Sequence, residues 1–230
     1  TRYAAAIAAT VPADTEVVLA GGTLEGRRVT PLSELLAAEP TAAVETAMHG
    51  THPGTITKFL FTSGSTKNPK AVVNNHRMWC ANQAQLRASI PALGEEPPVL
   101  VDWLPWNHTF GGNHNVGIAL YNGGTIYIDD GKPTPKGIEA TLRNLREISP
   151  SIYFNVPKGY EEIAGAMDHD ATLRQSLFKR VKAFMFAGAG LAQAVWDKLD
   201  AHAEATVGER IRMITGFGMT ETGPSCTFRV

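Results

Sequence analysis

A short stretch of the chain, FTSGSTKNPKAV at 61–72, combines hydroxyl, glycine and basic residues. Gly64 lets the backbone turn several N–H groups toward one point, the hydroxyls add neutral donors, and two lysines add positive charge. A polyphosphate suits such a loop, although a Ser/Gly-rich surface hairpin has a similar composition. The spacing differs from that of a Walker loop. The candidate phosphate-binding residues are Thr62, Ser63, Gly64, Ser65, Thr66, Lys67 and Lys70.

A second candidate segment is LPWNHTFGG, in which His108 lies between Trp106 and Phe110 and precedes a glycine pair. Judged by residue type alone, a histidine among aromatic residues is more often a packed structural residue than a functional one. The alternative is that its imidazole hydrogen-bonds a substrate carboxylate or a reacting phosphate. His114, further along the same segment, is expected on the surface or in the core of a helix and not in a metal site.

The segment FAGAGLAQ at 186–193 contains three small residues, Gly188, Ala189 and Gly190. Small residues let a backbone approach a flat ring closely, and a helix N-terminus is expected to follow. A helix start that merely needs small residues is the alternative interpretation. The sequence therefore leaves a ring-binding turn and a simple helix start open.

The segment ITGFGMTETGP at 214–224 offers three groups that a nucleotide could use. Phe217 has a ring face for stacking, Thr220 has a hydroxyl for a phosphate, and Glu221 has a carboxylate that can hold Mg²⁺. Considered alone, the run Thr-Glu-Thr in a loop is usually solvated surface. Its interpretation therefore depends on what lies near it in the fold.

Expected strands and helices alternate along most of the chain, and each candidate segment directly follows an expected strand. This alternation predicts an α/β fold, with a doubly wound, mostly parallel sheet flanked by helices. Ligands of such sheets bind at the carboxyl ends of the strands. The expected strands are 56–60, 70–74, 99–104, 125–128, 151–155, 183–186 and 210–215, and the expected helices are 76–90, 112–121, 135–148, 157–179 and 191–205.

The N-terminal part has weaker patterns. An alanine-rich helix is expected over 2–9 and a strand over 16–20, and a helix is expected to start with Thr30 as cap and Pro31 at its first position. A polar connection without a helix is expected from 41 to 54. In the helix at 76–90, an apolar stripe of Met78, Cys80, Ala81, Ala84 and Leu86 is expected to face the core.

Composition excludes several classes of protein. The 230 residues carry 21 basic and 22 acidic side chains, so no basic surface favours nucleic acid. A hydrophobic content of 43% suffices for a sizeable core, in one large domain or two small ones. The two cysteines have no metal-site spacing, and neither a signal peptide nor an apolar run of membrane-spanning length is visible. The sequence therefore predicts a soluble, cytoplasmic protein with neither nucleic acid nor membrane as partner.

The candidate segments resemble motifs of the adenylate-forming superfamily, which contains acyl-CoA synthetases, luciferases and peptide-synthetase adenylation domains. TSGSTKNPK is similar to its ATP phosphate loop, with Lys67 and Ala71 where glycines are usual, and LPWNH is similar to its PxxH segment. FAGAG resembles the GGAP-like adenine turn, with Gly190 where proline is common. GFGMTE resembles the YGxTE motif, with Phe217 in place of tyrosine.

The resemblance implies a domain that binds ATP, Mg²⁺ and a carboxylic acid. It implies that Lys70, His108, Thr220 and Glu221 are catalytic and that Glu221 holds Mg²⁺. Besides the phosphate loop, the nucleotide-binding residues that it implies are Gly188, Ala189, Gly190, Phe217, Gly218 and Thr220. The acid-pocket residues that it implies are His108, Phe110 and Gly111.

A narrower resemblance, to feruloyl-CoA synthases, is carried by TSGSTKNPKAV, DWLPWNHTFGGNHN and YNGGTIYIDDGKPTP. It implies that an aromatic, hydroxycinnamate-like acid such as ferulate becomes an acyl-AMP and then a thioester with coenzyme A. Residues 1–230 would form part of the N-terminal domain, without the hinge and the lysine-bearing C-terminal domain, and this piece alone is expected to adenylate poorly. A non-catalytic ATP-binding module and an amino-acid adenylation domain are the alternatives, and the oligomeric state stays open.

Overall fold

The computed structural model describes residues 3–62 and 68–229. The chain divides into two compact units between residues 52 and 53. We call them the N-terminal and the C-terminal unit and describe each by itself. Five of the predicted phosphate-loop residues lie outside the described residues: Ser63, Gly64, Ser65, Thr66 and Lys67. Among the described residues, none of the helices is long and apolar enough to cross a lipid bilayer.

Residues 3–52, the described part of the N-terminal unit, contain one parallel strand pair and three helices. The expected helix at 2–9 and strand at 16–20 are confirmed, with ends shifted by one or two residues. The pair is formed in parallel by β1 and β2. The elements are α1 (Ala4–Thr10), β1 (Val17–Leu19), β2 (Val29–Pro31), α2 (Leu32–Leu36) and α3 (Ala42–His49).

Two expectations for this unit are wrong. The expected helix forms as α2 from Leu32, but Thr30 does not cap it and Pro31 is not its first residue. Both belong to strand β2, and the Thr30 hydroxyl donates a hydrogen bond of 2.6 Å to Glu16 Oε1. The sequence predicts a polar connection without a helix over 41–54, but helix α3 lies there. The sequence of α3, AAVETAMH, contains several strong helix formers that its polar flanks obscure.

The C-terminal unit begins with two strands that the sequence predicts. Strands β3 (Ile56–Thr62) and β4 (Lys70–Asn75) pair in antiparallel fashion, and Thr62 is opposite Lys70 in the register. The chain then enters α4 (His76–Ser89) and the short helix α5 (Ala92–Glu95). The hairpin therefore brings both ends of the candidate phosphate loop to one place.

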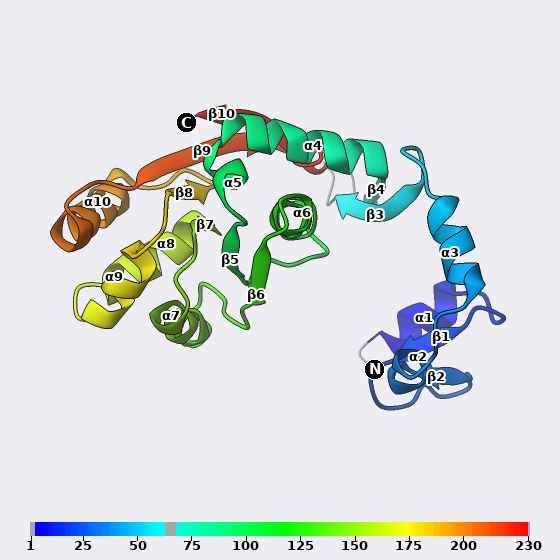
Figure 1. Cartoon of the computed structure of the whole chain (residues 1–230). Helices are drawn as coiled ribbons and strands as arrows, with labels where there is room; N and C mark the ends of the chain where they lie inside the picture. Colours follow the sequence, from blue (N-terminus) through cyan, green and yellow to red (C-terminus); the bar gives the residue numbers. More distant parts are fainter. Residues whose placement is uncertain (1–2, 63–67, 230) are drawn as a thin grey trace. The chain divides into compact units, whose positions relative to one another are not determined.

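Parallel strands form the centre of the C-terminal unit (Figure 1). Strands β7, β8 and β9 are parallel, and β5 pairs in parallel with β6 and contacts β7. This arrangement confirms the predicted α/β class. The strands are β5 (Val99–Asp102), β6 (Thr125–Ile128), β7 (Ile152–Asn155), β8 (Ala183–Phe186), β9 (Arg212–Gly218) and β10 (Ser225–Arg229). The helices are η1 (Phe110–Asn115, a π-helix), α6 (Val116–Tyr121), α7 (Ile138–Glu147), α8 (Pro157–Ala166), α9 (Ala171–Phe178), α10 (Gln193–Val207) and η2 (Thr220–Thr222).

The end of the sheet differs from the expectation. Strand β10 was not predicted, and it runs antiparallel to β9 at the edge of the sheet. Strand β9 continues to Gly218, so Phe217 lies in a strand instead of a loop. The turn between β9 and β10 therefore carries Thr220 and Glu221.

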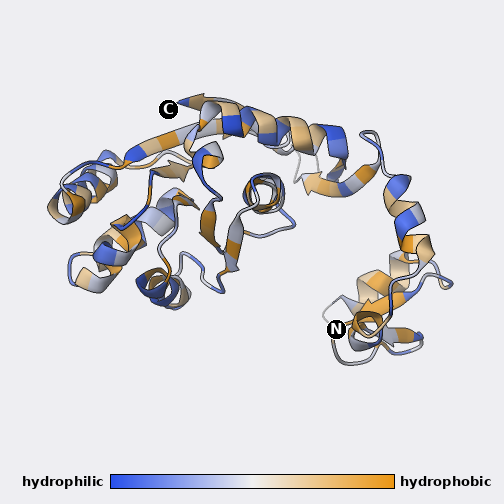
Figure 2. Cartoon of the chain, in the orientation of Figure 1, coloured by the Kyte–Doolittle hydropathy of each residue, from blue (hydrophilic) through white to orange (hydrophobic). Residues whose placement is uncertain are grey.

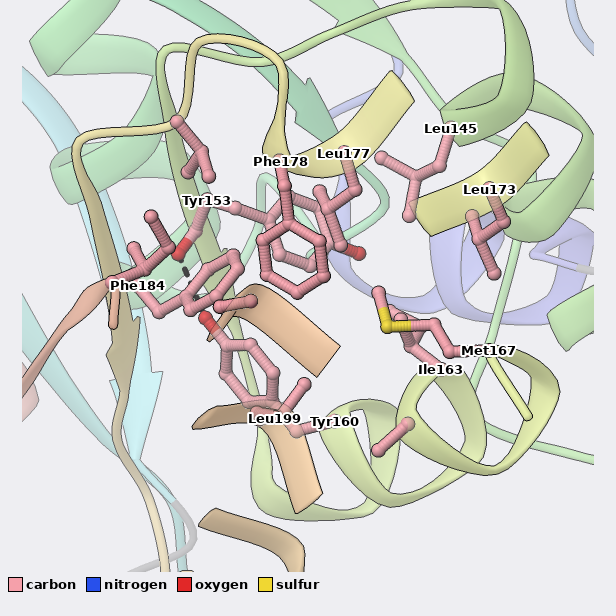
Figure 3. Close-up of a cluster of buried hydrophobic side chains, with 14 of the residues drawn as sticks. Leu145, Tyr153, Tyr160, Ile163, Met167, Leu173, Leu177, Phe178, Phe184 and Leu199 are labelled. Atoms are coloured by element: carbon pink, nitrogen blue, oxygen red, sulfur yellow. Dashed lines mark hydrogen bonds between the residues drawn. The ribbon is translucent and has the colours of Figure 1, made fainter. Parts of the chain in front are cut away.

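The larger apolar core packs α7, α8, α9 and α10 against the sheet (Figure 3). Tyr160 of α8 is fully buried, and its ring meets Tyr153 and Phe184 edge to face. The Tyr160 hydroxyl donates a hydrogen bond of 2.8 Å to the Tyr153 backbone oxygen and accepts one of 3.1 Å from the Met185 backbone N–H. This hydroxyl therefore fastens α8 to strands β7 and β8, and the carboxyl end of β8 leads to the candidate site residues Gly188 and Ala189.

The buried face of α4 is mostly polar, which contradicts the predicted apolar stripe. Hydrophilic residues occur along the whole of α4 in Figure 2. The residues that α4 buries are Asn82, Gln83 and Leu86, whereas Cys80, Ala81 and Ala84 are exposed. The reason is that α4 packs against backbone oxygens of η1 and β10, which need hydrogen-bond donors.

Candidate functional site

A cavity of about 690 Å³ lies at the carboxyl ends of β8 and β9. Thr62, from the end of the β3–β4 hairpin, lines it together with Thr220 and Glu221 of η2. The structure thus brings Thr62, at one end of the candidate phosphate loop, and the Thr-Glu turn to one cavity. The predicted site residues that line the cavity are Thr62, His108, Phe110, Gly188, Ala189, Phe217, Gly218, Thr220 and Glu221.

Three predicted residues lie elsewhere. Lys70 pairs with Thr62 in the hairpin, and its backbone oxygen accepts a hydrogen bond of 3.5 Å from the Thr62 hydroxyl. Gly190 lines a neighbouring cavity of about 430 Å³. Gly111 does not line the large cavity: a Cβ atom at this position would lie 2.5 Å from the Pro105 backbone oxygen. The close packing of η1 explains this glycine without a substrate contact.

The turn that presents Thr220 and Glu221 is held from within and from outside. The backbone N–H of Met219 donates a hydrogen bond of 3.0 Å to the Thr222 hydroxyl, which also contacts the Pro224 backbone oxygen. Gly223 has a φ of 83°, a conformation that glycine adopts without strain. From outside, Asn82 Nδ2 of α4 donates a hydrogen bond of 3.1 Å to the Ser225 backbone oxygen. These contacts fix the turn beside the cavity.

The Glu221 carboxylate suits a magnesium ion that phosphate oxygens also bind. It is exposed, lines the cavity, and has no hydrogen-bond or ion-pair partner among residues 3–62 and 68–229. No group of three or more His, Cys, Asp or Glu residues forms a metal site within the described part of the chain. Mg²⁺ commonly binds through one or two carboxylates together with substrate phosphates. The donor set fits Mg²⁺ bound with a polyphosphate.

The end of β8 and the end of β9 leave room for a flat ring. Gly188 has a φ of 90°, and no atom lies within 4 Å of the place where its Cβ would be. Phe217, on the neighbouring strand, is 63% exposed and also lines the cavity. An exposed aromatic face and an open glycine backbone are features that bind a purine ring by stacking. This region fits the adenine part of a nucleotide.

His108 faces the cavity as a hydrogen-bond donor. Its Nδ1 accepts a hydrogen bond of 3.2 Å from the Phe110 backbone N–H. When the imidazole is neutral, its proton is therefore on Nε2. Because His108 is exposed and lines the cavity, this N–H can serve a carboxylate or phosphate oxygen. The geometry favours the functional interpretation of His108 over that of a buried structural residue.

Residues 4–230 match the AMP-binding enzyme family. The chain belongs to this family. As an AMP-binding enzyme it is 27% identical over 159 residues to the long-chain-fatty-acid–CoA ligase ACSBG1 of Rattus norvegicus, covering 68% of this chain and 21% of that protein. It is 23% identical over 175 residues to ACSBG2 of Gallus gallus, covering 75% and 22%. The chain thus spans about a fifth of the length of these relatives.

Solved structures of similar fold include ligases and an adenylation domain. A malonyl-CoA ligase with methylmalonyl-CoA and AMP bound has a TM-score of 0.72 at 23% identity, covering 98% of this chain and 45% of that one. McyG A-PCP with phenylalanyl-adenylate has a TM-score of 0.67 at 21% identity, covering 90% and 36%. At such identities the likeness shows the fold of this AMP-binding enzyme and not its substrate.

Sequence reasoning missed one residue of the AMP-binding enzyme's cavity. His114 is 1% exposed, lines the cavity, and its ring meets the edges of Phe110 and Phe154 at 5.2 and 4.9 Å. Burial lowers the pKa of His114 from 6.5 to about 4, so the ring is neutral at neutral pH. The sequence leaves surface and core open for His114, and nothing in the run Asn113-His114-Asn115 indicates that it lines a cavity.

Proposed function

We propose that the protein containing this chain activates a carboxylic acid with ATP and Mg²⁺ to form an acyl-AMP, and then transfers the acyl group to coenzyme A. The observation that carries this proposal is that Thr62, Thr220 and Glu221 line a single cavity in a member of the AMP-binding enzyme family. The Thr62 hydroxyl from the hairpin, together with the Thr220 hydroxyl and the Glu221 carboxylate from the turn, suits a polyphosphate with its metal ion.

The chemistry requires that negative charge be compensated on both reactants. A carboxylate oxygen of the acid attacks the α-phosphorus of ATP and pyrophosphate leaves, after which the thiol of coenzyme A displaces AMP. Mg²⁺, when bound, would draw charge from the phosphate oxygens. In this scheme the Thr220 hydroxyl also stabilises the phosphates, and a well-placed donor is worth about 3 kcal/mol in the transition state.

His108 would bind the carboxylic acid, whereas the groups above bind the phosphates. Its Nε2–H would donate to a carboxylate oxygen and so fix the acid for in-line attack. Glu221 would bind the metal ion, because its carboxylate has no other partner among the described residues. The two side chains thus serve different substrates from one cavity, which makes their effects separable by mutation.

We further propose that the acid is aromatic and hydroxycinnamate-like, as in feruloyl-CoA synthases. Phe110, Met185 and Phe228 line the cavity, and Phe110 and Met185 belong to one apolar cluster. Aromatic and thioether side chains bind a planar ring favourably. The relatives named above are described as long-chain-fatty-acid–CoA ligases, so a fatty acid is the comparison that matters most.

Acid-dependent exchange of pyrophosphate into ATP tests the proposal. The complete coding sequence that contains this chain is expressed and assayed with ferulate, benzoate, a long-chain fatty acid, malonate and phenylalanine, and thioester formation is then followed with coenzyme A. Exchange and thioester formation are expected with ferulate. Exchange with phenylalanine alone would indicate an amino-acid adenylation domain, and ATP binding without any exchange would indicate a non-catalytic module.

A further inference from the structure

A chain of three buried side chains runs from the end of β5 to the cavity. Asp102 is 3% exposed, and its Oδ1 accepts hydrogen bonds of 2.8 Å from Asn115 Nδ2 and 3.3 Å from the Leu104 backbone N–H. Because Oδ1 is an acceptor in both contacts, the amide of Asn115 must present its NH₂ group to Asp102. Its oxygen, Oδ1, therefore points to the other side, toward His114.

This orientation determines the tautomer of His114. The distance from His114 Nδ1 to Asn115 Oδ1 is 2.7 Å, and an amide oxygen can only accept. Nδ1 must therefore carry the proton and donate it. Because the ring is neutral, Nε2 has a free lone pair and is a hydrogen-bond acceptor. Asp102 and Asn115 act as supports that hold the imidazole in this state.

His114 Nε2 has no hydrogen-bond partner within the described ranges. Leaving a buried polar atom unpaired costs about 1–3 kcal/mol, and such atoms in folded proteins almost always have a partner. His114 lines the large cavity, and the rings of Phe110 and Phe154 flank the imidazole. The missing partner is therefore expected to come from a molecule in the cavity.

We propose that His114 Nε2 accepts a hydrogen bond from a hydroxyl group on the acyl part of the substrate, so that the cavity prefers hydroxylated acids. The proposal rests on the proposed function, because it concerns the acid bound in that cavity. A hydroxyl group is a neutral donor and suits the apolar surroundings of Phe110, Phe154 and Met185. An ammonium group is also a donor, but its charge would be costly to bury among these side chains.

Substrate series that differ at one group test this preference. For the full-length protein, kcat/KM in pyrophosphate exchange is compared between 4-hydroxycinnamate, its 3- and 2-hydroxy isomers, cinnamate and 4-methoxycinnamate. A fatty acid and its terminal hydroxy derivative form a second series. The best hydroxylated acid is expected to exceed its deoxy and methoxy analogues on the order of 10-fold, because the analogues leave Nε2 unpaired.

Variants of His114 assign the preference to this residue. His114→Phe should bring the ratio of hydroxylated to deoxy acid close to one, whereas His114→Gln, which places an amide group near the position of Nε2, should retain part of it. The matched control is His169→Phe, because His169 is exposed and lies outside the cavity. The control should leave the ratio unchanged.

A spectroscopic measurement covers the case in which a His114 variant does not fold. The ¹⁵N signals of His114 in the unmodified chain should report a neutral ring with the proton on Nδ1, and the Nε2 signal should shift when a hydroxylated acid binds but not when its deoxy analogue binds. A proton on Nε2 in the free protein would overturn the inference. Equal kcat/KM for hydroxylated and deoxy acids would also overturn it while leaving the proposed function intact, and the absence of exchange with every acid would remove both.

Discussion

Asn82 of α4 and Ser225 of β10, 143 positions apart in the chain, are joined by a hydrogen bond of 3.1 Å from the Asn82 side-chain amide to the Ser225 backbone oxygen. The same amide reaches the Thr222 backbone oxygen at 3.5 Å. Helix α4 begins directly after strand β4, whose other end adjoins the phosphate loop. One helix therefore adjoins the β3–β4 hairpin and also supports the turn that carries Glu221.

Replacing Asn82 should disturb nucleotide binding although Asn82 does not line the cavity. In Asn82→Ala the Ser225 and Thr222 oxygens lose their donor, so the turn becomes less fixed, and KM for ATP should rise on the order of 10-fold. KM for the acid should change much less. Steady-state kinetics with each substrate varied in turn checks this, and Arg87→Ala, an exposed change on the same helix, is the control. Equal changes in both KM values would show that Asn82 merely stabilises the fold.

Replacing Glu221 should weaken Mg²⁺-dependent binding of ATP. Glu221→Gln keeps the shape of the side chain and removes the charge that the metal ion needs, so affinity for ATP in the presence of Mg²⁺ should fall on the order of 10-fold. Affinity measured without Mg²⁺ should hardly change. Calorimetric titration with and without Mg²⁺ measures both values, and Glu209→Gln, an exposed carboxylate outside the cavity, is the control. An equal loss in both conditions would exclude a role for Glu221 as a metal ligand.

Replacing His108 should affect the acid and not the nucleotide. His108→Ala removes the Nε2–H donor, so kcat/KM for the acid should fall roughly 10- to 100-fold. The affinity for ATP should stay the same, because Thr62, Thr220 and Glu221 are unchanged. Pyrophosphate exchange at varied acid, together with a separate ATP titration, distinguishes the two effects. A weaker affinity for ATP with an unchanged kcat/KM for the acid would contradict this prediction, because it would show that His108 contacts the nucleotide and not the acid.

The stability of the protein should depend on pH through two buried groups of opposite effect. Burial raises the pKa of Asp102 from 3.8 to about 6, so this carboxyl favours the folded state less as pH rises from about 4 to 6. Burial lowers the pKa of His114 from 6.5 to about 4, so the neutral imidazole favours the folded state more as pH rises over the same range. Each effect corresponds to about 3 kcal/mol, and the two largely cancel.

Single substitutions should reveal each effect. Relative to the unmodified protein, the free energy of unfolding of Asp102→Asn should rise with pH between about 4 and 6, and that of His114→Phe should fall. Urea denaturation at several pH values measures both slopes. Parallel curves for the two variants would contradict the assignment of these pKa shifts.

Local patterns predict most of the helices and strands, although not α3 or β10, and they do not show which residues distant in sequence become partners. The apolar run before Thr62 and the β-branched run after Lys70 predict two strands, and the structure confirms both and pairs them in antiparallel fashion. The polar face of α4 was missed because Asn82 is buried only through its contacts with residues far along the chain. His114 was missed for a similar reason, since its burial depends on the fold around η1 and on the support from Asp102.

The hairpin end at Thr62 and the turn at Glu221 are proposed to bind one nucleotide together. A crystal structure of the protein with Mg²⁺ and α,β-methylene-ATP, which cannot be cleaved at the bond that adenylation breaks, tests it directly. The triphosphate is expected between Thr62 and Thr220, with the metal ion on Glu221 and the adenine beside Phe217 and Gly188. A nucleotide bound elsewhere, or one that touches only the hairpin or only the turn, would contradict the claim.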